Sequence, residues 1–286
     1  MISDITLGQF FPGESPIHRL DPRTKIIMSI IFIVSVFLAS TPMAFLVLIT
    51  FTALMISVSR ISFKIILKGI KPIIIVLIFT AIINVFMTKG ATEPLVSFWI
   101  IKIYKEGIIR AVFMALRVVI LIVGTSVFLT YTTSPISLTD GIESLLSPLK
   151  LIKVPVHLFA MMMTIALRFI PTLVEETEKI MNAQKSRGAD FSSGGLIKRA
   201  KALIPIIIPL FVSSFKRAEE LATAMECRCY RGDKNRTKLV KLSYGWLDLV
   251  YSMGTLAFLA AVITLRVYAS RVAFELPLLK IFFYVI

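Results

Sequence analysis

Two short segments of the chain share one pattern, an arginine between two small residues. They are Ser186-Arg187-Gly188 and Cys227-Arg228-Cys229, and each has a glutamate nine residues before its arginine, Glu178 or Glu219. The planar guanidinium of arginine suits bidentate capture of a carboxylate, and small neighbours let a partner's backbone approach closely. An arginine in the last turn of a helix also interacts favourably with the helix dipole. This interaction stabilises the helix by about 0.3–1 kcal/mol and needs no partner. Because the two segments match, we predict docking sites for two equivalent cytosolic partners.

Candidate catalytic groups are scarce in this sequence. Asp140 and Glu143 lie three residues apart in a predicted short helix, where a solvated or capping role suits them. Cys227 and Cys229 are too close for an unstrained disulfide, and the two histidines complete no metal-ligand spacing. No phosphate-cradling glycine loop is present. We expect no catalytic residue, metal ligand or cofactor, and an interfacial membrane enzyme is the alternative that would need them.

The composition places both segments in a membrane protein. Hydrophobic residues make up 57% of the 286 residues, the mean hydropathy is +0.86, and several apolar runs approach twenty residues. About 20 apolar residues in a helix cross a hydrocarbon core of about 30 Å. The net charge of +15 fits lysines and arginines gathered beside anionic headgroups. No basic stretch carries the aromatics or motifs of a nucleic-acid-binding protein. We therefore predict an all-α integral membrane protein that contacts the lipid bilayer and binds no nucleic acid.

The apolar runs predict about five transmembrane helices, over residues 26–40, 43–58, 72–87, 107–131 and 245–267. Basic residues at Arg19, Arg23 and Lys25 favour a cytoplasmic N-terminus. Asp21 and Pro22 suit the N-cap and first position of the first helix. Residues 89–105, including Pro94 and Trp99, are expected to form an external loop or interfacial helix. Arg110 and Arg117 share one face of the fourth predicted span. We favour structural roles for both over a role in transport: Arg110 would snorkel near the outer surface, and Arg117 would pair inside the bundle.

Four segments follow from this pattern: a cytoplasmic N-terminal segment (1–25), the first four transmembrane helices (26–133), a cytoplasmic domain (134–243), and the last transmembrane helix with the C-terminal segment (244–286). The cytoplasmic domain is predicted to hold a short helix at 135–150 and two long helices at 156–187 and 196–228. Each long helix starts apolar and becomes amphipathic. Pro171 in the first and Pro205 and Pro209 in the second should kink them, because proline removes a helical hydrogen bond.

Four stretches of the sequence resemble the transmembrane (T) component of energy-coupling factor transporters, a cobalt-transport-permease-like family within the ATP-binding-cassette group. They are residues 18–25, Ala166-Leu167-Arg168-Phe169-Ile170-Pro171, Ala183–Gly188 and Ala224–Tyr230. The resemblance covers nearly the whole chain. It implies a complex in a bacterial or archaeal cytoplasmic membrane that imports vitamins or metal ions. Two cytosolic ATPases would bind the small-Arg-small motifs, and a separate substrate-binding (S) membrane subunit would carry the cargo.

Carried over by position, the resemblance assigns ATPase docking to Ser186, Arg187 and Gly188 and to Cys227, Arg228 and Cys229. The second motif of the family is more often Ala-Arg-Gly, so this chain departs from it at both flanks while keeping them small.

The apolar halves of the long helices would face the S subunit in this arrangement. Met161, Met162 and Met163 form a run there, and methionine repacks easily against different partners. Contact with lipid or with the protein core would explain this run equally well. Pro171, Pro205 and Pro209 would act as joints.

A stand-alone secondary transporter is the remaining alternative. Such proteins usually have paired halves and polar residues near the membrane midplane. Here Asn84 is the main polar residue deep in a predicted span, and the spans show no duplication. We therefore favour a non-catalytic subunit that transmits ATP-driven motion from partner ATPases.

Overall fold

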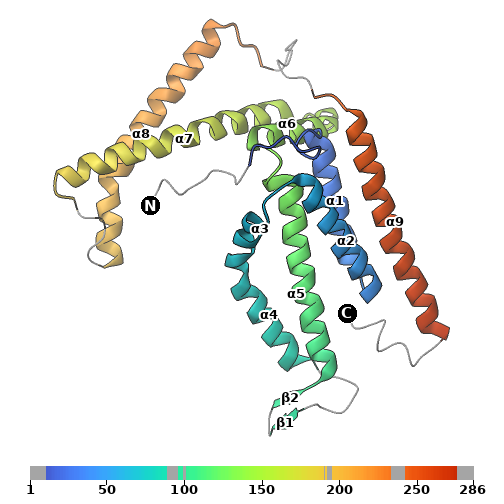
Figure 1. Cartoon of the computed structure of the whole chain (residues 1–286). Coiled ribbons are helices and arrows are strands. Elements are labelled where there is room, and N and C mark those ends of the chain that lie inside the picture. Colours follow the sequence, from blue (N-terminus) through green and yellow to red (C-terminus); the bar gives the residue numbers. More distant parts are fainter. Residues whose placement is uncertain are drawn as a thin grey trace. The chain divides into compact units, whose positions relative to one another are not determined.

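The computed structural model describes residues 11–88, 96–98, 101–189, 191, 195–232 and 242–275. The regular elements in these ranges are helices, apart from one short two-stranded hairpin, so the predicted all-α class is confirmed (Figure 1). The chain divides into two compact units. The first, here called the bundle unit, comprises Gln9–Gly141 and Leu242–Ile286. The second, the long-helix unit, comprises the described residues of Ile142–Lys241.

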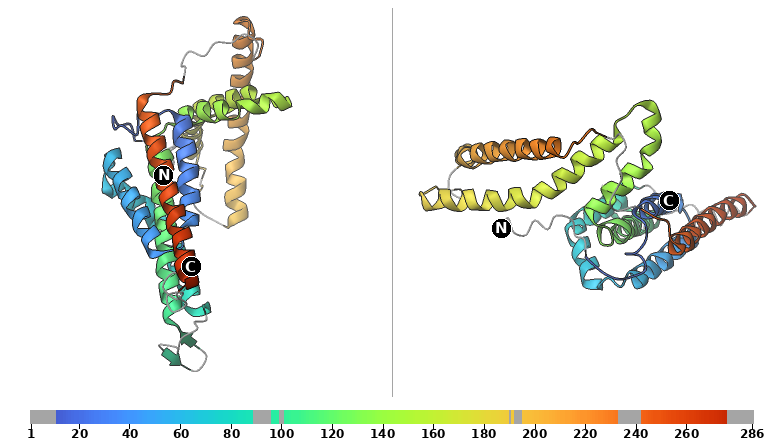
Figure 2. Two further views of the ribbon diagram at one scale, coloured as in Figure 1. Left: turned by 90° about the vertical axis from the view of Figure 1, so that its right-hand side faces the viewer. Right: turned by 90° about the horizontal axis from the view of Figure 1, so that it is seen from above.

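The bundle unit contains α1 (Pro22–Leu38), α2 (Pro42–Ser59), α3 (Phe63–Ile70), α4 (Ile74–Met87), α5 (Lys105–Thr125) and α9 (Trp246–Glu275). A 3-10 turn joins α3 to α4, and a π-helical stretch, Ser126–Thr130, follows α5. Helices α1, α2, α5 and α9 pack together, and α4 packs on α5 (Figures 1 and 2).

Local signals in the sequence set where α1 begins. The carboxylate of Asp21, the N-cap, accepts a hydrogen bond from the backbone N–H of Arg23 at 2.9 Å. Pro22 occupies the first helical position, where its missing N–H has no intrahelical partner to lose. The predicted N-cap is therefore confirmed. Thr41 and Pro42 start α2 in the same way.

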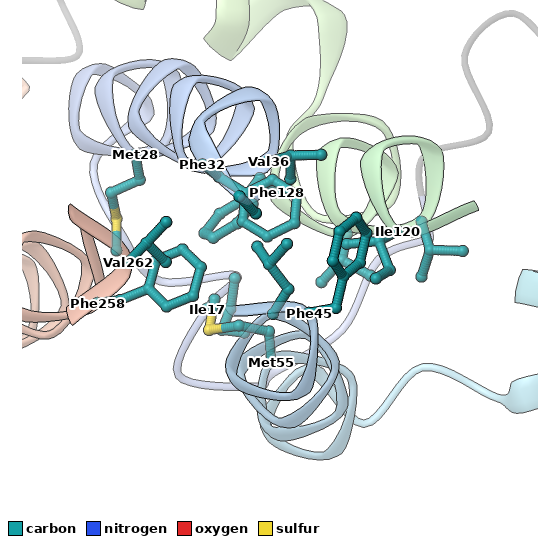
Figure 3. Close-up of a cluster of buried hydrophobic side chains, with 14 of the residues drawn as sticks. Ile17, Met28, Phe32, Val36, Phe45, Met55, Ile120, Phe128, Phe258 and Val262 are labelled. Carbon is teal, nitrogen blue, oxygen red and sulfur yellow. The ribbon is translucent and has the colours of Figure 1, made fainter. Parts of the chain in front are cut away.

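Aromatic side chains fill the centre of the bundle unit. Phe32 on α1 is fully buried, with its ring centroid 5.7 Å from Phe128, 6.2 Å from Phe51 and 6.2 Å from Phe258. Gly124 on α5 lies directly against the Phe32 ring, because a Cβ built on it would overlap that ring. Figure 3 shows labelled side chains from α1, α2, α5 and α9 pointing toward one another. This close packing holds the apolar helices to each other where lipid offers no hydrophobic drive.

A buried polar network joins the starts of α1 and α9. The carboxylate of Asp248 accepts a hydrogen bond from the backbone N–H of Asp21 at 2.8 Å. Lys25, 2% exposed, donates from Nζ to the carbonyls of His18 at 3.2 Å and Thr132 at 2.8 Å. A buried ammonium is tolerated because it is hydrogen-bonded and lies near carboxylates. The basic segment that precedes α1 is thus fixed to the bundle.

Arg117 closes the other end of α1. Its Nη2 donates to the carbonyl of Ala39, the C-cap residue of α1, at 2.7 Å, and its guanidinium lies over the Phe45 ring at 5.5 Å from the centroid. A cation at a helix C-terminus is favoured by the helix dipole. These contacts support the structural role predicted for Arg117.

Five helices among the described residues are long and apolar enough to cross a membrane: Pro42–Ser59, Phe63–Met87, Lys105–Thr130, Val156–Ser186 and Trp246–Ala269. The number agrees with the prediction, but the set differs. Helix α1 has 17 residues, about 25 Å of rise, whereas α7 (Val156–Ser186) has 31 residues and a markedly apolar first half. The location of α7 in the cytoplasm and the crossing by α1 therefore remain predictions.

A short hairpin lies between α4 and α5. Strands β1 (Val96–Phe98) and β2 (Ile101–Ile103) pair antiparallel, with Val96 opposite Ile103. The interfacial helix considered for residues 89–105 is therefore wrong for this part. The β-branched and aromatic residues of both strands favour extended structure. Pro94 and Trp99 lie outside the described residues.

The long-helix unit is built around α7 and α8 (Leu196–Cys227), which contact each other. The short helix α6 (Pro135–Leu145) precedes them, and the boundary between the two units falls within it. A 3-10 stretch, Ser147–Ile152, follows α6, so the predicted helix at 135–150 is shorter than expected. The starts predicted for both long helices are confirmed. The helices run unbroken through Pro171, Pro205 and Pro209, and Figure 1 shows α8 changing direction between its halves.

Candidate functional site

The end of α7 forms a Schellman motif around the first small-Arg-small segment. The backbone N–H of Gly188 donates to the carbonyl of Lys185 at 2.9 Å, and that of Ala189 donates to Gln184 at 3.0 Å. Gly188 has φ +86°, the left-handed conformation that this motif requires. Arg187 is the C-cap residue, with φ −89° and ψ 9°.

The end of α8 repeats this geometry. The N–H of Cys229 donates to the carbonyl of Glu226 at 2.8 Å, and that of Tyr230 donates to Met225 at 3.0 Å. Arg228 is again the C-cap residue, with φ −88° and ψ 16°. Cys229 has φ +55°, so it occupies the left-handed position that Gly188 fills in the first motif. The two ends, here called the α7 tip (Ser186–Gly188) and the α8 tip (Cys227–Cys229), therefore share one backbone design.

Two details of the prediction change. Each arginine was expected at the last helical position, but α7 ends at Ser186 and α8 ends at Cys227, so both arginines lie one residue beyond the helix. The replacement of the more usual glycine by Cys229 leaves the turn intact, because the cysteine itself adopts the left-handed conformation. A non-glycine residue does so at a cost of about 1–2 kcal/mol.

Both tips present their side chains to solvent. All six residues of the two tips are exposed. In the part of the chain that the structure describes, neither Arg187 nor Arg228 forms a hydrogen bond or an ion pair through its guanidinium. Each guanidinium adjoins the negative end of its helix dipole, which favours a cation there. The guanidinium groups of Arg187 and Arg228 are planar and lie on turns with the same backbone geometry. Each is suited to bidentate binding of a carboxylate on a partner.

Glu176 on α7 links the two long helices. Its Oε1 accepts a hydrogen bond from Ser213 Oγ at 2.6 Å, and its Oε2 accepts a hydrogen bond and ion pair from Arg217. Ser213 and Arg217 are four residues apart and thus share one face of α8. We call these three residues the α7–α8 clamp. The structure therefore shows a contact that the sequence analysis missed, because Glu176 and Arg217 lie on different helices, 41 residues apart in the chain.

The tips lie on opposite sides of the place where α8 crosses α7 (Figures 1 and 2). Arg187 follows Glu176 by eleven residues, and Arg228 follows Arg217 by eleven residues. At 1.5 Å per residue, each arginine is about 16 Å along its helix from the clamp. The equal spacing of eleven residues can be counted in the sequence. It becomes a structural feature only because the α7–α8 clamp places the two starting residues, Glu176 and Arg217, in contact.

The remaining candidate residues lie in the apolar halves. Met162 and Met163 are 57% and 41% exposed, and Met161 is half-buried. Pro171, Pro205 and Pro209 are exposed inside their helices. Several large apolar side chains of α8 are also exposed: Leu203, Ile204, Ile207, Ile208, Phe211, Val212 and Phe215. The apolar halves of both long helices therefore expose large apolar side chains.

Comparison with known proteins decides the family. The model of the cobalt transport protein family matches residues 13–239. An energy-coupling factor transporter transmembrane protein of Clostridium kluyveri is 53% identical over 95% of this chain and 100% of its own length. Proteins of the same name from Ruminiclostridium cellulolyticum and Bacillus subtilis are 53% and 46% identical, each over 93% of this chain and 98% and 100% of their own lengths.

The chain belongs to the energy-coupling factor transporter transmembrane protein family. The predicted family is thereby confirmed. Both tips fall within the matched residues 13–239, as does the α7–α8 clamp. The names of the relatives describe transmembrane parts of transporters, which agrees with the multi-pass membrane fold described above.

Proposed function

We propose that this chain is the coupling subunit of an energy-coupling factor importer. In this proposal two cytosolic ATP-binding-cassette ATPases dock on the α7 and α8 tips, one on each. The chain itself is non-catalytic, and the ATPases hydrolyse ATP. The observation that carries the proposal is the congruence of the two tips, since each places one exposed arginine at the C-cap of a Schellman motif.

The docking chemistry follows from the exposed guanidinium groups. A carboxylate on each ATPase would accept two parallel hydrogen bonds from Arg187 or Arg228, and such charge-assisted pairs are short and directional. The small flanking residues, Ser186 with Gly188 and Cys227 with Cys229, leave the backbone of each tip open to close approach. Two equivalent tips suit a dimer of ATPases because a two-fold arrangement presents the same socket twice.

The apolar halves of α7 and α8 would contact a separate substrate-binding membrane subunit. Met162, Met163 and the exposed apolar residues of α8 supply a large surface that the described part of the chain leaves uncovered. Methionine adapts to differently shaped partners. When ATP draws the two ATPases together, the tips would follow, and the apolar halves would move against the substrate-binding subunit. The cargo would be a vitamin or a metal ion bound by that subunit.

The proposed location is a bacterial or archaeal cytoplasmic membrane. The N-terminal segment and residues 134–243 would lie on the cytoplasmic side, where Arg19, Arg23 and the lysines of α3 meet anionic headgroups. In this arrangement α1 crosses the membrane as part of the packed bundle of α1, α2, α5 and α9, although it is short. Helix α7 runs along the cytoplasmic surface instead of crossing.

Co-purification tests the docking proposal directly. The chain would be co-expressed with the paired ATPases of its own genome and captured through a tag on one ATPase. We expect the wild type to co-purify, Arg187→Glu or Arg228→Glu to reduce recovery by about tenfold or more, and the double variant to abolish it, because each reversal places like charges together.

Charge-matched controls are Lys179→Glu on α7 and Lys201→Glu on α8, both exposed and away from the tips. These controls should co-purify like the wild type. Equal recovery of all variants would show that the two arginines stabilise the helix ends but do not bind the ATPases, and the proposal would fail. Each variant must also elute from size exclusion in detergent at the wild-type position, which separates lost docking from lost folding.

A further inference from the structure

We propose that Glu176, Ser213 and Arg217 form the pivot of the two long helices: positioning residues that fix the crossing of α7 and α8, and through which movement of the tips is passed to the apolar halves. The first part stands on the geometry of the chain alone. The second part rests on the proposed function, because it requires ATPases on the tips.

The clamp fixes the crossing in two respects. One carboxylate uses both oxygens, and its donors, Ser213 Oγ and an Arg217 Nη2, sit one helical turn apart on α8. A single hydrogen bond would let α8 rotate about its axis or slide by a turn. Because Ser213 and Arg217 lie four residues apart and both donate to the Glu176 carboxylate, they fix the rotation of α8 about its axis and its register along α7.

Past the prolines, the described residues of the two helices include half-buried side chains but no fully buried ones. Beyond Pro171, none of the described α7 residues is buried, and neither is any α8 residue beyond Pro209. Glu176 is 22% exposed in its side chain and Arg217 is 39% exposed, so they are among the better covered polar groups of this region. A thin interface of this kind can change its crossing angle, provided that one contact keeps the helices in register.

Both helices have the same order of parts. In each, an apolar half comes first, then a proline, then the clamp, then eleven residues to the arginine of the tip. Pro171 precedes Glu176 by five residues, and Pro209 precedes Ser213 by four. Proline removes a helical hydrogen bond and loosens the helix at that point. The segments from clamp to tip lack proline, so they are the stiff arms of about 16 Å on either side of one pivot.

Distances between spin labels test the pivot. The native cysteines are first replaced by Cys227→Ala and Cys229→Gly, and recovery with the ATPases is checked. One label pair then reports on the tips, at Lys185→Cys and Glu226→Cys. A second pair reports on the apolar halves, at Met162→Cys and Ile204→Cys. All four positions are exposed.

The first measurement uses the full chain alone in lipid nanodiscs. We expect Glu176→Gln and Arg217→Gln to broaden the distribution of distances between the tips by about twofold or more, because the charged bidentate link is lost. The exchange Glu176→Arg with Arg217→Glu should restore a narrow distribution. Glu175→Gln and Lys216→Gln, exposed neighbours of the clamp, should leave the distribution unchanged. An unchanged distribution in the clamp variants would overturn the pivot whether or not ATPases dock on the tips.

The second measurement uses the complex with the ATPases, without nucleotide and with ATP plus vanadate. In the wild type we expect both distances to change with nucleotide. In the clamp variants the tip distance should still change, while the change in the apolar halves should fall by about threefold or more, since the arms are no longer linked. An undiminished change in the apolar halves would overturn the pivot. Loss of co-purification in the arginine variants is scored separately, so failure of docking is distinguishable from failure of the pivot.

Discussion

The bundle unit and the long-helix unit hold their shape by different means. In the bundle unit, Phe32, Phe128 and Phe258 meet in a closed aromatic centre, and Lys25 and Asp248 lie in a buried polar network. In the long-helix unit, the buried residues of α7 are confined to its first five positions, and a polar clamp links α7 to α8. Both units expose apolar side chains, but the bundle unit also has a buried interior, whereas the long-helix unit has few buried residues.

This difference shows where each unit obtains its stability. The bundle unit carries a buried interior of its own, which stabilises the packing of α1, α2, α5 and α9. The long-helix unit exposes Phe159, Met162 and the apolar residues of α8, so anything that covers these side chains would add to its stability. Partners that bind the folded form stabilise it by mass action. Few internal contacts are expected of a unit that moves as the proposed function requires.

The largest effect that would test this comparison is expected at Phe32. Phe32→Ala removes a fully buried ring that contacts three other rings, and we expect a loss of about 3–5 kcal/mol in the free energy of unfolding. The matched variant in the long-helix unit is Phe159→Ala, whose ring is 56% exposed. It should change the free energy by no more than about 0.5 kcal/mol. Denaturant titration in detergent micelles measures both, and similar losses would remove the contrast between the units.

A smaller effect is expected at Gly124, where α5 touches α1. Gly124→Ala should cost about 1–3 kcal/mol, because its Cβ would overlap the Phe32 ring and the surrounding rings prevent that ring from moving aside. The same titration measures the loss.

The control is Phe32→Leu, alone and combined with Gly124→Ala. The shorter side chain leaves room for the new methyl group, so the double variant should lose less than the sum of the two single variants. Strict additivity would mean that the close approach of α5 to Phe32 is not what limits residue 124.

The sequence carried the local features of the fold and missed the contacts between helices. Long apolar runs predicted four of the five helices that are long and apolar enough to cross a membrane, and Asp21 followed by Pro22 predicted the start of α1, because length and capping are properties of neighbouring residues. The early end of α6 was also readable, since Ser147 precedes Pro148 and such a residue is disfavoured in a helix. The hairpin at Val96–Phe98 and Ile101–Ile103 was missed because three-residue strands have too little pattern to separate them from loop.

The candidate site divides in the same way. Arg187 and Arg228 stood out because their immediate neighbours match, whereas the Schellman turns depend on backbone geometry that Cys229 gave no reason to expect. The clamp joins Glu176 to residues 37 and 41 positions later, so only the packing of α7 on α8 could reveal it. Equal spacing of eleven residues to each arginine is visible in the sequence once the crossing point is known.

The smallest expected effects compare the two tips. Gly188 has φ +86° with open space around it, so Gly188→Ala meets no clash and costs only backbone strain, about 1–2 kcal/mol. Relief of that strain would move residue 188 out of the left-handed conformation that Cys229 keeps at the α8 tip, and we expect this to weaken capture of the ATPases by about tenfold. Gly188→Asn should be milder, because asparagine tolerates the left-handed conformation.

Cys229→Gly relieves strain at the α8 tip and should leave capture within about twofold of the wild type. Titration of the ATPases against the full chain in nanodiscs measures each affinity. If Gly188→Ala binds as well as the wild type, the left-handed turn is not needed for docking, and the likeness of the two tips would reflect helix termination alone.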